Sequence, residues 1–123
     1  MTASRGQQIA AGKFGWFDEW QCEGCGLVSD DWGDGPGPED LRQGLLAQHG
    51  GFRPRPVEGR DGTVAAARHL RTLLDLGPAE AIGLLRAAKA GRPLGTAVEV
   101  EALVRALRRD GYAYETVPAG PEG

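Results

Sequence analysis

The sequence predicts an α+β protein, in which a small β-α-α-β-α-β domain, with three helices on a short antiparallel sheet, follows a loop-rich N-terminal segment with one short helix. Between positions 63 and 111, three apolar stripes recur at helical spacing, and a glycine closes each of them. Segments at 52–57 and 112–117 alternate as strands do and flank the stripes. A chain of 123 residues has room for one main core, so we expect these elements to share it.

The first expected strand, 52–57, contains two prolines, Pro54 and Pro56. Proline has no N–H to donate to a sheet, so this segment fits only an edge strand or an extended arm. A helix is expected next, from Thr63 to about Asp75, because alanine and leucine recur on one of its faces.

The second and third helices have clear start signals. Gly77 ends the first helix, and Pro78 opens the second, since proline lacks only an N–H that a first turn cannot use. A short extended piece around 92–94 then leads to Thr96 and Glu99, whose spacing is typical of a capping box that starts the third helix. The strand at 112–117 completes the domain.

Residues 1–51 form a separate segment, ahead of the domain at 52–123. Its aromatic stretch at 14–20 indicates packing against another part of the chain, whereas the acidic, glycine-rich run at 29–37 predicts a loop. A short helix is expected from Pro38 to about Gln48, where a pair of glycines ends it.

Charge is distributed unevenly along the chain. The formal net charge of −3 divides into −5 over residues 1–51 and +2 over residues 52–123. Either both parts are simply solvated, or the acidic segment docks on or shields the basic domain. Nucleic-acid binding is disfavoured, because the whole chain is acidic and its aromatic residues lie mostly in the acidic part.

Several function classes lack support. No run of about 18 apolar residues occurs, and no apolar stretch follows a basic start, so we expect a cytoplasmic protein without a membrane span. The only serines, Ser4 and Ser29, stand outside any nucleophile-elbow pattern. The acidic run also lacks the spacing of a calcium loop. We therefore expect a non-catalytic protein.

The cysteine pair is the one chemically distinctive motif. Cys22 and Cys25 have the spacing of half a tetrahedral zinc site, and the neighbouring glycines let the chain bend around a metal ion. His49 is the better third ligand, since His69 lies on an expected helix face, and no fourth ligand is evident. A structural zinc site, two free packed thiols and a thiol-redox pair remain open alternatives.

Three stretches together resemble the C-terminal domain of the bacterial large-subunit ribosomal stalk protein. They are Thr-Val-Ala-Ala-Ala-Arg-His-Leu-Arg at 63–71, Leu-Gly-Pro-Ala-Glu-Ala at 76–81, and Ala-Leu-Val-Arg-Ala-Leu at 102–107 with Gly111 and Tyr-Glu-Thr-Val at 114–117. The resemblance spans Phe52 to about Pro118. Residues 1–51 resemble neither the helical dimerisation region nor the hinge of that family, so the chain is not expected to be the stalk protein itself.

In that family the face formed by the first two helices recruits translational GTPases. The resemblance therefore implies a protein-docking surface, and an apolar patch rimmed by cations suits an acidic, partly apolar partner helix. A translational GTPase is the expected partner; the alternative is a toxin that this chain blocks as an immunity or antitoxin-like protein, and a thiol-redox role of the cysteine pair is a second alternative. The matched positions are Val64, Ala65, Arg68, Arg71 and Gly77.

Overall fold

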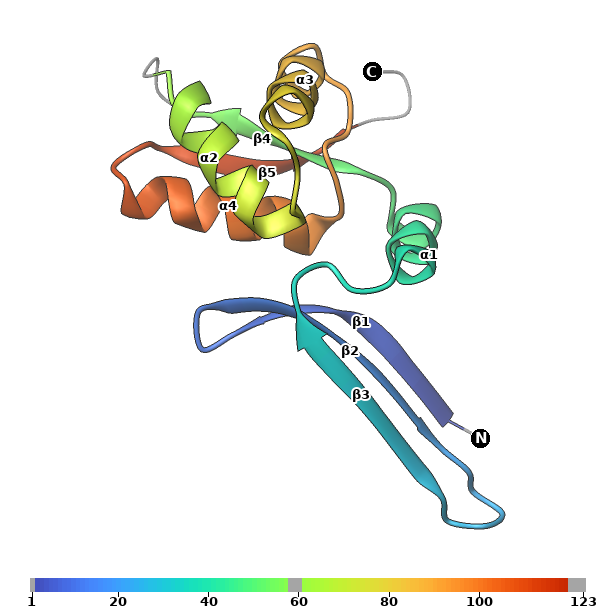
Figure 1. Ribbon diagram of the computed structural model, residues 1–123. Helices are drawn as coiled ribbons and strands as arrows, with labels where there is room; N and C mark the ends of the chain where they lie inside the picture. Colours follow the sequence, from blue (N-terminus) through green and yellow to red (C-terminus); the bar gives the residue numbers. More distant parts are fainter. Residues whose placement is uncertain (1, 58–60, 120–123) are drawn as a thin grey trace.

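A computed structural model describes residues 2–57 and 61–119 and confirms the α+β class (Figure 1). The N-terminal part is an antiparallel sheet followed by a helix, and the C-terminal part places three helices on a two-stranded sheet. No helix in these two ranges is long and apolar enough to cross a membrane. The elements are β1 (Thr2–Ala10), β2 (Lys13–Gln21), β3 (Val28–Asp34), α1 (Glu39–His49), β4 (Phe52–Pro56), α2 (Thr63–Leu74), α3 (Pro78–Lys89), α4 (Ala97–Arg109) and β5 (Tyr114–Pro118).

The N-terminal segment differs from the expected loops, because most of residues 2–34 form a meander in the order β1-β2-β3. The aromatic stretch becomes β2, and Trp16 pairs with Gln7 on β1 and with Gly33 on β3. The acidic run expected to be a loop is mainly β3. Its side chains are largely exposed on both faces, so no alternation of apolar and polar residues marks it as a strand.

The C-terminal part follows the expected order, with one strand reduced to a bridge. β4 pairs with β5, and on its other side Phe52 forms an isolated bridge with Gly95. The Phe52 carbonyl accepts from Leu94 N–H at 2.8 Å, and Phe52 N–H donates to the Gly95 carbonyl at 2.8 Å. Backbone groups of a strand alternate between its two neighbours, so the prolines at 54 and 56 face this sparsely paired side, away from β5. Their positions explain why β4 tolerates them.

Helix α4 is the centre of the core. Leu103 and Leu107 are fully buried on α4 and pack with Leu70 of α2, which is 1% exposed. Full burial of one such side chain contributes about 2 kcal/mol, so these contacts dominate the packing of the helices. The expected capping box begins α4: Thr96 Oγ1 accepts from Glu99 N–H at 3.1 Å, and Thr96 N–H donates to Glu99 Oε1 at 3.1 Å.

A buried polar cluster joins the N-terminal part to α4. It contains Gln7 of β1, Arg42 of α1, Thr96 and Glu99. Gln7 donates from Nε2 to Glu99 Oε2 at 2.8 Å, and Thr96 Oγ1 donates to Gln7 Oε1. In this contact a base of the acidic segment meets an acid of the basic domain, which is the opposite of the charge pairing in the docking alternative.

Candidate functional site

The expected docking surface lies along the exposed side of α2. Val64 is 81% exposed in the first turn, and Arg68 and Arg71 follow it at one and two turns. We call these residues the docking stripe: Val64, Arg68 and Arg71. Within the described chain neither arginine forms an ion pair, although Arg71 Nε donates to the Leu76 carbonyl at 3.4 Å. The stripe thus offers an apolar side chain and two cations to solvent.

Two of the matched positions have different environments from the stripe. Ala65 is 4% exposed and belongs to the hydrophobic core, so its side chain is not available to a partner. Gly77 is the N-cap of α3, and its N–H donates to Glu80 Oε1 at 3.3 Å. The left-handed residue that ends α2 is Asp75, with φ of 54°, and Gly77 has an ordinary extended conformation. Gly77 therefore lies in the turn beside the stripe with backbone angles that other residues can also adopt.

The cysteine pair lies in the turn between β2 and β3, at the end of the hairpin that points away from the helices (Figure 1). Cys22 N–H donates to the Leu27 carbonyl at 2.7 Å, and Gly26 N–H donates to the Cys22 carbonyl at 2.8 Å. Gly26 has φ of 75°, a conformation that glycine adopts without strain. The Cys25 side chain is exposed, and the Cys22 side chain is partly so.

Hydrogen bonding to sulfur favours the thiolate of Cys22. The Cys25 side chain and the backbone N–H groups of Cys25 and Gly24 bond to it and lower the pKa of Cys22 below its ordinary value. A thiolate is the form of cysteine that binds metal ions and attacks disulfides. This local geometry suits either kind of chemistry.

The histidines expected as further ligands lie elsewhere. His49 ends α1 and lines a hollow of about 410 Å³ with Phe17, Leu45 and Phe52. His69 lies on α2, and its Nε2 is 2.6 Å from Asp110 Oδ2. Among the described residues, no group of three or more histidine, cysteine, aspartate or glutamate side chains could hold a metal ion. The predicted set Cys22, Cys25 and His49 is thus not brought together.

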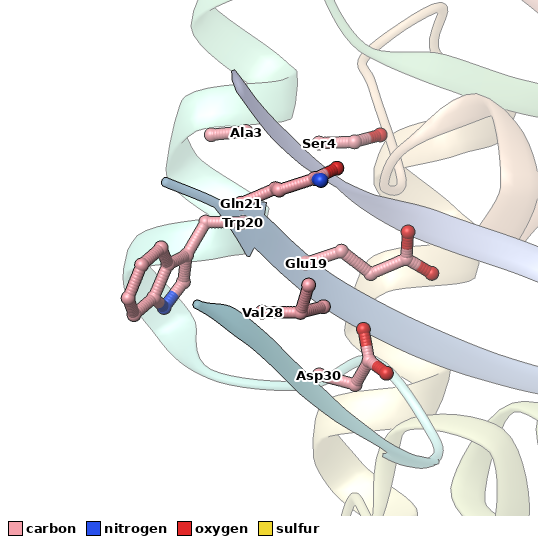
Figure 2. Close-up of a pocket in the computed structure, with 7 residues that line it drawn as sticks. All are labelled: Ala3, Ser4, Glu19, Trp20, Gln21, Val28 and Asp30. Carbon is pink, nitrogen blue, oxygen red and sulfur yellow. The ribbon is translucent and has the colours of Figure 1, made fainter. Parts of the chain in front are cut away.

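A small hollow of about 160 Å³ lies on the N-terminal sheet near the cysteine turn (Figure 2). Figure 2 shows the carboxylates of Glu19 and Asp30 projecting the same way, while the Trp20 ring turns the other way. Ligand pockets usually enclose about 300 Å³ or more. This hollow is smaller than that; its lining is Ala3, Ser4, Glu19, Trp20, Gln21, Val28 and Asp30.

Sequence reasoning missed the polar cluster that holds the two parts together. In the sequence, Thr96 and Glu99 indicate only a helix cap, and no pattern of residues connects them with Gln7 or Arg42.

Comparison with models of protein families, with curated proteins and with solved structures gives no match to this chain.

Proposed function

We propose that this chain is a non-catalytic protein-binding module whose docking stripe on α2 captures an acidic, partly apolar helix of a partner protein. The observation that supports it best is Val64, which is 81% exposed although it lies in the first turn of a helix whose other apolar residues are mostly buried. An isolated apolar residue on a surface is ordinary. One that begins a row with two cations that form no ion pair in the described chain is consistent with the core and rim of an interface.

The dimensions of the stripe suit a helix. Val64 to Arg71 spans about 10 Å along α2, or about two helical turns. A partner helix that crosses α2 can place an apolar side chain on Val64 and carboxylates near Arg68 and Arg71. The apolar contact supplies affinity, while the charge pairs mainly set the association rate and the register.

Two partner classes follow from the expectations above. A translational GTPase is the class that the stalk-like order of elements implies, and a toxin is the class for an inhibitory role. Gene neighbourhood distinguishes them, because a toxin reading frame beside this one favours inhibition and ribosomal genes favour translation. We propose the GTPase first, because Val64, Arg68 and Arg71 are both matched positions and exposed residues.

The experiment measures binding of the purified full chain to purified translational GTPases by calorimetry at low and physiological salt. Arg68→Ala with Arg71→Ala is expected to weaken binding at least tenfold and to reduce its salt dependence. Val64→Ser is expected to weaken binding without changing the salt dependence.

The charge-matched control is Arg55→Ala with Arg105→Ala. Both of these arginines are exposed and lie outside α2 and α3, and they pair with Glu115 and Glu101. The control is expected to bind as the unmodified chain does. Equal losses in the control and the stripe variants, or no binding to any GTPase tested, would remove the proposal for this partner class.

A further inference from the structure

The turn that bears Cys22 and Cys25 presents two metal-binding atoms outward. It joins the ends of β2 and β3, and Figure 1 shows this end of the hairpin far from the helices. Cys25 is exposed, and Leu27 and Val28 beside it are 62% and 60% exposed. Because the helices lie toward the opposite end of the hairpin, a second molecule can approach this turn without contacting them.

The described part of the chain does not bring enough soft ligands together to close a tetrahedral site by itself. It contains two cysteines and two histidines in all. His69 is engaged with Asp110 at 2.6 Å, and His49 lines a different hollow. No histidine, cysteine, aspartate or glutamate joins the cysteine pair as a third ligand in the described ranges. Structural zinc nonetheless requires four ligands.

We propose that Cys22 and Cys25 supply two thiolates to a zinc ion whose other two ligands are Cys22 and Cys25 of a second copy of this chain. Four thiolates in a tetrahedron are a common structural zinc site, and two cysteines separated by two residues span one edge of it. Two identical turns related by a two-fold axis give a closed arrangement. The metal then joins two molecules, and each half-site is incomplete without its partner.

The local structure prepares the turn for this role. Two hydrogen bonds close the turn, from Cys22 N–H to Leu27 at 2.7 Å and from Gly26 N–H to Cys22 at 2.8 Å. The ligands therefore need little ordering when the metal binds.

Exposed apolar residues beside the turn support a second copy as the partner. Leu27 and Val28 follow Cys25 after one glycine, so a two-fold contact through the metal brings two such pairs close together. Their burial adds area to a contact that the zinc ion alone would make small.

The test is native mass spectrometry of the full chain, kept reduced with a phosphine and titrated with zinc chloride. The expected product is a dimer with one zinc per two chains, and cobalt chloride is expected to give the absorption of a tetrahedral thiolate complex. Cys22→Ser and Cys25→Ser should each abolish both the metal and the dimer. His49→Ala, the matched control, should leave both unchanged.

Four results would overturn the proposal. They are a monomer with one zinc, loss of zinc in His49→Ala, a dimer that persists in Cys22→Ser, and reduced thiols that bind no zinc. Formation of a Cys22–Cys25 disulfide with no zinc uptake after reduction would favour the redox alternative. The proposal is independent of the docking stripe, because Arg68→Ala with Arg71→Ala is expected to leave zinc-dependent dimerisation intact.

Discussion

Arg42 of α1 and Glu99 of α4 form a bidentate pair, although 57 positions separate them along the chain. Arg42 Nε donates to Glu99 Oε2 at 2.5 Å, and Arg42 Nη2 donates to Glu99 Oε1 at 2.8 Å. The Glu99 side chain is 0% exposed, and the Arg42 side chain is 20% exposed. Because Gln7 of β1 also bonds to Glu99, one carboxylate fixes two elements of the N-terminal part on α4.

We expect Arg42→Ala to lower the free energy of unfolding by about 3 kcal/mol, since loss of one partner leaves a buried charge uncompensated. All three tryptophans lie in residues 16–32 of the N-terminal sheet. Denaturant titration followed by tryptophan fluorescence should therefore show the N-terminal part loosening before the helices, whose unfolding circular dichroism reports. A single transition unchanged from the unmodified chain would contradict the role of the pair.

A double substitution distinguishes the cost of burying an unpaired charge from the loss of the Arg42 contacts. Arg42→Ala with Glu99→Gln should be more stable than Arg42→Ala alone, because the neutral amide costs less to bury without an arginine. Arg55→Ala serves as the control, since Arg55 and Glu115 form an exposed pair worth at most about 1 kcal/mol.

Trp16 provides a second prediction, at two glycines in one loop. Gly35 and Gly37 both have φ of 83°, but a Cβ on Gly37 would lie 2.7 Å from Trp16 Cγ, whereas one on Gly35 would meet nothing within 4 Å. Gly35→Ala should cost about 1 kcal/mol from the left-handed backbone alone. Gly37→Ala should cost about 1–3 kcal/mol more, because the rigid indole must move. Equal costs in thermal unfolding would show that Trp16 does not pack on this loop.

Residues 52–119 were largely predictable from the sequence because the signals there are local. Pro78 starts α3, the capping box starts α4, and the apolar stripes identify the faces that pack. The extended piece expected around 92–94 was less evident in the sequence. In the structure it forms one isolated bridge, between Gly95 and Phe52, and a single bridge needs no run of strand-forming residues. Pro54 and Pro56 correctly restricted β4 to a strand with a sparsely paired edge.

The N-terminal sheet was not predictable in the same way. β3 contains four residues with low strand propensity, three aspartates and a glycine, and its pairing with β2 decides its conformation. Gln7 and Arg42 have no local pattern that indicates a buried partner 92 or 57 positions away. The cysteine spacing was visible in the sequence, but its place at a hairpin end depends on that same sheet.

Glu101 of α4 provides a prediction about pH. Burial tends to raise its pKa, but hydrogen bonds from Thr116 at 2.8 Å and Arg105 at 3.0 Å outweigh it, so the pKa of Glu101 is lowered. A carboxyl whose folded pKa lies below its unfolded value, about 4.3, contributes stability above that pH. This contribution is lost as the pH falls through the folded pKa.

Glu101→Gln should therefore destabilise the chain by only about 0.5 kcal/mol at pH 6, because solvent partly screens this carboxylate. The difference from the unmodified chain should shrink below about pH 4. Denaturant titrations of both proteins at pH 6 and below about pH 4 measure this change. A difference that stays constant with pH would indicate that the charge of Glu101 contributes nothing.

Val64 and Ala65 are adjacent in α2 but lie in opposite environments, at 81% and 4% exposure. Val64→Glu should change the free energy of unfolding by less than about 0.5 kcal/mol, because glutamate suits an exposed first turn. Ala65→Glu should cost about 3 kcal/mol or more, because it places an unpaired carboxylate and extra volume in the core. Thermal unfolding of the two variants compares them directly, and both alter charge equally. If Ala65→Glu were tolerated, α2 would be rotated from its described orientation, and the docking stripe of Val64, Arg68 and Arg71 would no longer face solvent.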